Sequence, residues 1–181
     1  RPVTNNHSAT ASNYTVLWPL SNDKAGRMLD DTVIDISNVW KIFGAKPDLA
    51  LKAIRDRGLS KSEVLAEFNA VVGVADVSLT VKRGEIFCIM GLSGSGKSTL
   101  VRHFNRLLEP TAGKIEIEGT DVMALSPRDL QRFRNQKIGM VFQKANPFPK
   151  SIFRNVAWGP EINGMDGDIN MRVETALSQA A

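Results

Sequence analysis

A short run near the middle of the chain has the residue types and spacing needed to hold a phosphate group. Residues 91–98 read Gly-Leu-Ser-Gly-Ser-Gly-Lys-Ser and match the pattern G-x-x-x-x-G-K-[ST] at every fixed position. The three glycines can take backbone dihedrals closed to other residues, so successive N–H groups can converge on an anion. A helix beginning near Lys97 would add partial positive charge at the same place. The run therefore predicts a phosphate-binding loop.

The polar side chains of such a loop have distinct roles. We expect the Lys97 ammonium to reach the β- and γ-phosphates of a nucleoside triphosphate and the Ser98 hydroxyl to ligate Mg²⁺. The alternative is a glycine-rich turn between a strand and a helix, with a solvated lysine. The residues expected to contact the nucleotide are Gly91, Ser93, Gly94, Ser95, Gly96, Lys97, Ser98 and Thr99.

The sequence on either side predicts the elements that hold this loop. Residues 85–90 form an apolar run of the length expected for a strand buried on both faces of a parallel sheet. Residues 100–108 follow the helical period, with one apolar and one polar face. The apolar positions are Leu100, Val101, Phe104, Leu107 and Leu108, and the polar ones are Arg102, Asn105 and Arg106. We therefore expect a strand, the loop and a helix in direct succession.

Alternation of apolar and polar residues indicates further strands. Residues 32–39 and 74–81 alternate as half-exposed strands do, and residues 114–119 alternate between turn residues. Residues 137–142 are predicted as a strand that ends at Gln143. These patterns predict an α/β fold, a P-loop NTPase core with a mainly parallel sheet. An antiparallel β layer from the N-terminal portion and the start of an α-helical subdomain would complete it.

Helix signals lie in a charged insertion that we place at residues 44–73. A first segment opens at Pro47 and is broken by Gly58. Ser60 and Glu63 then form a capping-box pattern ahead of a second apolar face. We expect this face to pack in the core or between subunits rather than to bind a ligand.

Further helix signals lie toward the C-terminal end. Ser126-Pro127 predicts a helix start, and residues 152–158 also read as helix. Asp168 is a candidate cap for a last helix, so residues 143–181 would begin the helical subdomain. Residues 1–31 are rich in Ser, Thr, Asn and Asp and predict a poorly ordered tail.

Composition narrows the class of protein. The formal charge of +4 over 181 residues is mild, with basic and acidic residues interspersed, so nucleic-acid binding has no special support. Cys88 is the only cysteine, which excludes an intrachain disulfide and fits a buried apolar residue in a reducing compartment. No apolar run has the roughly 18 residues of a membrane span, and no signal peptide is visible. A first residue of Arg rather than Met suggests a fragment.

The order of these motifs resembles the ATP-binding subunit of an ABC transporter over about residues 32–181, which would form a partial nucleotide-binding domain. In that family an aromatic residue shortly after the first strand stacks on adenine. The resemblance assigns this role to Phe43, with Trp40 as second choice and core packing as the alternative. Gln143 matches the family's glutamine loop, whose amide contacts Mg²⁺ and the attacking water. The resemblance thus gives Lys97 and Gln143 catalytic roles and implies ATP and Mg²⁺ as ligands.

Within the family, residues 32–142 look most like the ATPases that power import of glycine betaine, proline and other quaternary amines. Val39-Trp40-Lys41-Ile42-Phe43-Gly44 and the insertion with Gly58-Leu59-Ser60-Lys61 carry that likeness. Residues 142–149 and 155–160 instead look like the ATPase of phosphate importers. A hybrid, a divergent relative and a joining artefact all remain open, and the longer match favours the quaternary-amine importers.

The resemblance also implies partners and missing parts. The sequence lacks three parts of the family pattern: the signature Leu-Ser-Gly-Gly-Gln, a strand ending in Asp-Glu, and a switch histidine. Neither His7 nor His103 fits the position of the switch histidine. The resemblance implies a head-to-tail dimer, a transmembrane permease that residues 143–160 would face, and indirectly a solute-binding protein. The subunit would lie in the cytoplasm on the inner face of the membrane. We expect this chain to bind ATP weakly with negligible turnover.

Readings outside transport are also open. A GTPase would need a D-x-x-G after the loop, whereas the only match, residues 23–26, precedes it. A DNA-repair ATPase of the ABC type would carry long heptad runs, which the sequence does not show. A small-molecule kinase with an arginine-bearing lid is the remaining alternative.

Overall fold

The computed structural model describes residues 15–16, 31–144, 146–165 and 167–180, with the side chains of residues 15–16 left aside. The chain divides into two units, Arg1–Leu130 and Gln131–Ala181. Nearly all of the predicted tail, residues 1–31, therefore lies outside the described residues.

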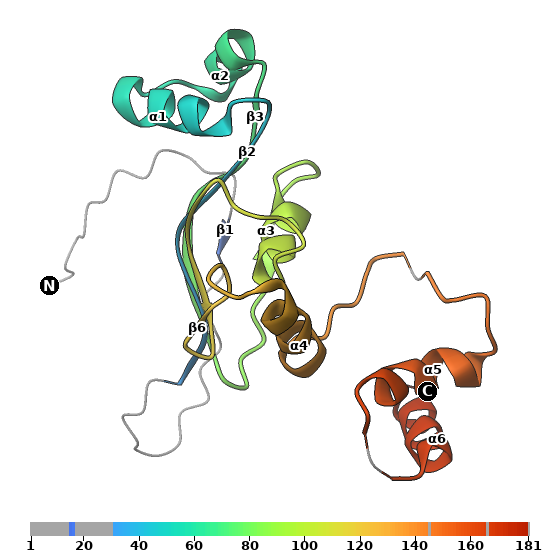
Figure 1. Cartoon of the computed structure of the whole chain (residues 1–181). Helices are drawn as coiled ribbons and strands as arrows, with labels where there is room; N and C mark the ends of the chain where they lie inside the picture. The colour runs from blue at the N-terminus through green and yellow to red at the C-terminus, as the bar shows by residue number, and fades with distance from the viewer. Residues whose placement is uncertain (1–14, 17–30, 145, 166, 181) are drawn as a thin grey trace, which may run out of the picture. The chain divides into compact units, whose positions relative to one another are not determined.

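A four-stranded antiparallel sheet forms the body of the first unit (Figure 1). Its order is β3-β2-β5-β6, with β2 at Thr32–Phe43, β3 at Val71–Lys82, β5 at Ala112–Ile117 and β6 at Thr120–Asp121. The strands expected over residues 32–39, 74–81 and 114–119 are confirmed as β2, β3 and β5, and β2 and β3 are longer than expected. The buried positions of the three long strands are Ile36, Val39, Ile42, Val74, Ile115 and Ile117.

The backbones of β2 and β3 are irregular at the same place in the sheet. Asn38 and Asp76 have φ of 51° and 49°, and Asn38 Nδ2 donates to Asp76 Oδ1 at 3.0 Å. Asn and Asp are the side-chain-bearing residues that best tolerate left-handed backbone. Across β2, a Cβ at Gly113 would lie 2.5 Å from the Asn38 carbonyl oxygen, so only glycine fits there. The register of β2 shifts here, against β3 between Ile36 and Val39 and against β5 between Ser37 and Trp40, as it does at a β-bulge.

The insertion between β2 and β3 consists of two helices, α1 at Pro47–Arg57 and α2 at Lys61–Phe68. Both expected signals operate: Gly58 ends α1 in left-handed conformation, and Ser60 with Glu63 forms a complete capping box. Arg57 pairs with Glu67 at 2.6 Å and ties α1 to α2.

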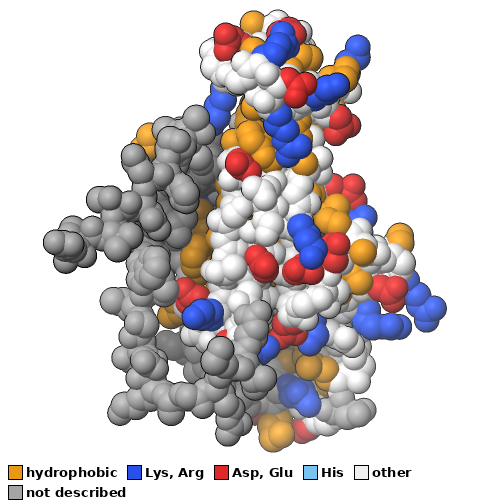
Figure 2. Space-filling model, turned by 90° about the vertical axis from the view of Figure 1, so that its left-hand side faces the viewer, with side chains coloured by type: hydrophobic (Ala, Val, Ile, Leu, Met, Phe, Trp, Pro, Cys, Tyr) orange, Lys and Arg blue, Asp and Glu red, His pale blue; other side chains and the backbone are white. Residues whose placement is uncertain are grey.

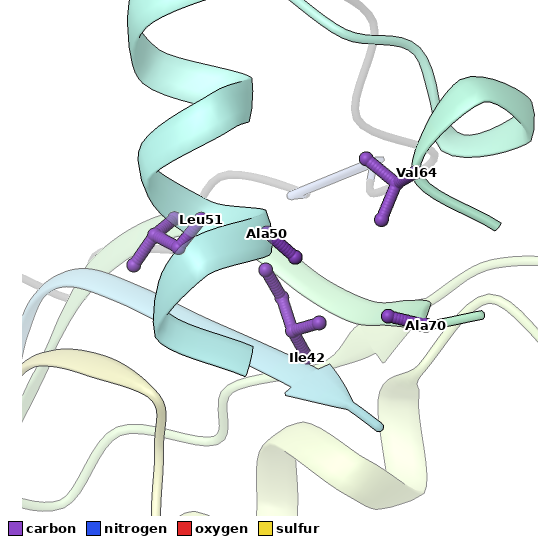
Figure 3. Packing of buried hydrophobic residues seen from close by; sticks show 5 residues of the cluster. All are labelled: Ile42, Ala50, Leu51, Val64 and Ala70. Carbon is purple, nitrogen blue, oxygen red and sulfur yellow. The ribbon is translucent and has the colours of Figure 1, made fainter. Parts of the chain in front are cut away.

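Figure 3 shows the apolar faces of these helices packed against the end of β2. The buried cluster contains Ile42, Ala50, Leu51, Val64 and Ala70. Its members come from β2, from both helices and from the residue just before β3, so the expected packing role of the insertion is confirmed within this chain. A hollow of about 250 Å³ lies beside it, lined by Lys61, Ser62, Leu65, Ala70, Val71 and Val72.

The strand expected before the loop is shorter than predicted. Only Ile89–Met90 form a strand, β4, which pairs antiparallel with β1 at Thr15–Val16. Ile86 is 89% exposed and Cys88 is exposed, which contradicts the prediction of a buried strand and a buried cysteine. A strand buried on both faces needs bonded neighbours and covering helices. All strand pairings among the described residues are antiparallel, so these residues form no parallel sheet.

The helix after the loop, α3, spans Lys97–Phe104 and ends earlier than predicted. Arg106 has φ of 52°, a left-handed backbone that stops the helix. The buried face holds Leu100 together with His103, which the sequence pattern had not placed there, while Leu107 is exposed. The predicted apolar face is therefore only partly correct.

The helix α4, Pro127–Lys137, starts where Ser126 and Pro127 predict. The Ser126 hydroxyl accepts from the Asp129 N–H at 3.2 Å. This helix continues through the first residue of the strand predicted over 137–142, and none of the residues that follow it to Phe142 is a strand. Val141 is 98% exposed, so this prediction is wrong for the described chain. As for residues 85–88, an apolar run forms no strand among the described residues unless a second strand pairs with it.

In the second unit, α5 at Ile152–Ile162 and α6 at Ile169–Ala180 pack on each other through buried Ala157 and Val173. The Asp168 carboxylate accepts from the Asn170 N–H at 2.8 Å, as its cap position predicts. Within the described residues, no helix has the length and hydropathy needed to cross a bilayer. Figure 2 shows basic and acidic side chains interspersed over one face of the described chain.

Candidate nucleotide-binding site

The predicted phosphate-binding loop connects β4 to α3. Gly94 and Gly96 have φ of 77° and 94°, so both require the left-handed region that glycine adopts without strain. Gly96 is the N-cap of α3, and its carbonyl accepts from the Leu100 N–H at 2.8 Å. A Cβ at Gly94 would meet no described atom within 4 Å. The glycine at 94 is therefore needed for backbone conformation and not for space.

The Lys97 side chain folds back into the loop. Its Nζ donates to the carbonyl oxygens of Gly91 and Leu92, both at 2.7 Å, and contacts Ser95 Oγ at 3.4 Å. The ammonium thus neutralises inward-pointing carbonyl dipoles and lies inside the curve of the loop. A bound phosphate would replace these acceptors, because its oxygens are the stronger acceptors for an ammonium group.

The hydroxyl residues of the loop are accessible to different extents. Ser93 and Ser98 are exposed, whereas Ser95 and Thr99 are partly buried. Ser98 lies in the first turn of α3, and its exposed hydroxyl is the hard oxygen donor that Mg²⁺ prefers. The described residues contain no group of three His, Cys, Asp or Glu that could hold a metal ion by themselves. The donor set therefore fits a cation that arrives with phosphate oxygens.

Phe43 is the last residue of β2 and is 39% exposed. Trp40, the other aromatic candidate, is partly buried against the insertion cluster. Lys41 Nζ lies 5.2 Å from the centroid of the Phe43 ring, and a Cβ at Gly73 would lie 2.6 Å from Phe43 Cε2. Sequence analysis did not single out Lys41 or Gly73. The sequence signal for Lys41 was its spacing of two residues from Phe43, which places both on one face of a strand. The signal for Gly73 was that it is an isolated glycine within a strand.

Gln143 belongs to the second unit and lies exposed in the segment between α4 and α5. Nearby, Asn155 organises the next turn: its Nδ2 donates to the carbonyl oxygens of Phe148, Lys150 and Ser151, and its Oδ1 accepts from the Phe148 N–H. Lys150 Nζ then lies 4.3 Å from the centroid of the Trp158 ring. The turn that follows Gln143 in the sequence is therefore held in place by these contacts. The role of Gln143 itself stays a prediction.

Of the two histidines, His103 lies within the described residues, on α3. His7 is outside the described residues. His103 is fully buried on α3, and its Nδ1 and the Thr99 carbonyl oxygen are 2.6 Å apart, so the neutral ring donates from Nδ1. Burial lowers the pKa of His103, chiefly because charge is disfavoured away from water. His103 is thus a packed residue of the loop helix.

The sequence and the fold of this chain are similar to those of known proteins. The sequence model of the family described as ABC transporter matches residues 74–181. The glycine betaine/proline betaine transport system ATP-binding protein ProV of Escherichia coli (strain K12) is 46% identical over 136 residues, 75% of this chain and 34% of that protein. This chain thus spans about a third of that relative.

Two further likenesses concern the alternative importer and the fold. The phosphate import ATP-binding protein PstB 2 of Synechocystis is 41% identical over 121 residues, 63% of this chain and 44% of that protein. A dimeric structure of the ATP-binding cassette MJ0796, in a post-hydrolysis state bound to ADP and Pi, superposes with a TM-score of 0.59 at 25% identity. It covers 80% of this chain and 54% of that one. The α/β P-loop NTPase class is thereby confirmed.

Proposed function

Because the chain belongs to the ABC transporter family, we propose that it is the nucleotide-binding part of an ATP-binding subunit that energises solute import by ATP hydrolysis. This membership sets aside the readings as a GTPase or a small-molecule kinase, and the glycine betaine relative supports transport over a DNA-repair ATPase of the ABC type. The activity proposed is that of the whole protein, to which this chain contributes the phosphate loop.

The observation that carries the proposal is the built loop at the N-terminus of α3. Gly94 and Gly96 hold the left-handed backbone, and the Lys97 ammonium is already inside the loop. Main-chain N–H groups from Gly91 to Thr99, with the side chains of Ser93, Ser95 and Ser98, would bind the phosphates. Phe43 would stack on the base.

Catalysis would divide between two residues. Lys97 would stabilise charge on the transferred phosphoryl group, and Gln143 would orient the attacking water. Ser98, by its exposed hydroxyl, and Gln143, by the family resemblance, are the residues that we propose to hold Mg²⁺, which would neutralise phosphate charge. Since the signature and the strand-end carboxylates do not occur in this sequence, we expect weak ATP binding with turnover near background.

For the solute we propose glycine betaine, proline or a related quaternary amine. The support is the glycine betaine relative, which matches over the longer span. Import of phosphate is the second candidate, supported by the Synechocystis relative and by residues 142–149 and 155–160. The sequence of the gene beyond residue 181, with its neighbouring permease gene, discriminates between the two.

The proposed partners follow from the same family. They are a second ATPase copy arranged head to tail, a transmembrane permease, and indirectly a solute-binding protein, with nucleic acid excluded. The cassette MJ0796 is described as a dimer, which supports the paired arrangement. The proposed location is the cytoplasmic face of the membrane, held peripherally through the permease.

Titration with a fluorescent ATP analogue tests the loop. Lys97→Ala removes the ammonium and should weaken binding about 10- to 150-fold, because a hydrogen bond to a charged group is worth about 1.5–3 kcal/mol. Lys52→Ala, an exposed lysine on α1, is the charge-matched control and should bind like the parent chain. If Lys97→Ala and the parent chain bind the analogue with equal affinity, the assignment of the phosphate-binding loop is wrong. ATP hydrolysis that depends on Lys97 would contradict the expected lack of turnover.

A further inference from the structure

The ring proposed to stack on the base is covered by a neighbouring cation. Lys41 and Phe43 are two residues apart on β2 and therefore share a face of the sheet. Lys41 Nζ lies 5.2 Å from the ring centroid, within the distance at which an ammonium is attracted to an aromatic face. The face of Phe43 that Lys41 covers is therefore already partly occupied.

A second contact fixes the ammonium in this place. Lys41 Nζ donates to the Glu109 carbonyl oxygen at 2.8 Å. The Glu109 carboxylate in turn accepts from Arg106 Nε at 3.0 Å and from Arg106 in an ion pair at 2.9 Å. Arg106 lies two residues after the end of α3, so the loop helix is linked through Glu109 to Lys41.

The ring has little freedom to turn away from the ammonium. A Cβ at Gly73 would lie 2.6 Å from Cε2 and 3.1 Å from Cδ2 of Phe43. This edge of the ring therefore rests on the β3 backbone. The missing side chain at residue 73 is what lets the ring lie there.

We propose that Lys41 is a specificity-determining residue that covers the stacking face of Phe43 and so reduces the share of ATP affinity that comes from the base. The inference rests on the proposed nucleotide site. Binding of adenine must displace the ammonium from the ring, which costs about 0.5–1 kcal/mol at an exposed site. Removing the cation should therefore strengthen the base contribution about two- to fivefold.

Comparison of ATP with inorganic tripolyphosphate, both with Mg²⁺, isolates the base. The measured quantity is the Kd of tripolyphosphate divided by the Kd of ATP. Because tripolyphosphate carries one more negative charge than ATP, the rise in a neutral Lys41 variant is counted only beyond any rise in Lys52→Met, which loses the same charge elsewhere. This ratio should rise about two- to fivefold in Lys41→Met, which keeps the unbranched side chain without its charge. Lys41→Gln, which can still donate to the Glu109 carbonyl, should give the same rise.

Two controls should keep the parent ratio. Lys41→Arg retains a cation for the ring, and Lys52→Met removes the same charge from α1. An unchanged or lowered ratio in both neutral variants overturns the inference, and their tripolyphosphate affinity shows that the loop is intact. If the parent chain binds neither ligand, the proposed function itself falls. If it binds both with equal affinity, the base site at Phe43 is wrong.

Discussion

Replacement of Gly94 by alanine tests whether the loop needs its observed backbone. Gly94 has φ of 77°, and a Cβ there would meet no described atom within 4 Å. The cost of alanine is therefore conformational alone, about 1–2 kcal/mol for an L-residue in the left-handed region. If the bound loop requires this backbone and the free alanine variant relaxes out of it, ATP affinity should fall about 5- to 30-fold.

Equilibrium titration with a fluorescent ATP analogue measures this loss. Gly139→Ala is a matched control, because a Cβ at Gly139 also meets nothing within 4 Å and its φ is not positive. It should bind like the parent chain. Gly94→Asn should lie between parent and alanine, since asparagine tolerates left-handed backbone better. Gly94→Ala binding within about twofold of the parent would refute the reasoning from dihedral strain.

Two further predictions concern stability. His103 has a folded-state pKa below its usual 6.5, so protonation favours the unfolded chain and stability should fall as pH drops below about 6.5. In chemical denaturation, His103→Leu should lose less stability than the parent between about pH 7 and pH 5. Ser60→Ala removes the capping box of α2 and should lower the free energy of unfolding by about 1 kcal/mol. Ser62→Ala removes only the hydroxyl contact with Ser60 Oγ at 3.0 Å and should lower it by less.

Each stability prediction has a clear contrary result. Parallel pH curves for His103→Leu and the parent would show that His103 does not titrate in the unfolding transition. Equal unfolding free energies for Ser60→Ala and Ser62→Ala would mean that the hydrogen bonds between Ser60 and Glu63 are replaced by water without loss.

Several features were readable from the chain because they depend on residues a few positions apart. The capping box of Ser60 and Glu63, the left-handed end of α1 at Gly58 and the start of α4 at Ser126-Pro127 all occur where the sequence predicts. Each involves contacts within about one helical turn. The spacing of the loop from Gly91 to Ser98 is local in the same sense.

The apolar runs before Gly91 and Gln143 show where this reasoning fails. Their length and composition are typical of buried strands, yet Ile86 and Val141 are almost fully exposed. A strand forms only when a second strand supplies hydrogen bonds, and that partner can lie anywhere in the sequence. An apolar pattern therefore indicates that a segment tends to be buried, but it does not show whether a second strand is present to pair with it.

Local sequence thus specified the turns, caps and phosphate loop, because their hydrogen bonds close between near neighbours in the chain. The surroundings of Phe43 came from folding, since Gly73 is brought to the ring by β3 and Glu109 reaches Lys41 from beyond α3. The burial of His103 on α3 has the same origin. Contacts between residues tens of positions apart depend on strand register and helix packing, and no short stretch of sequence encodes either.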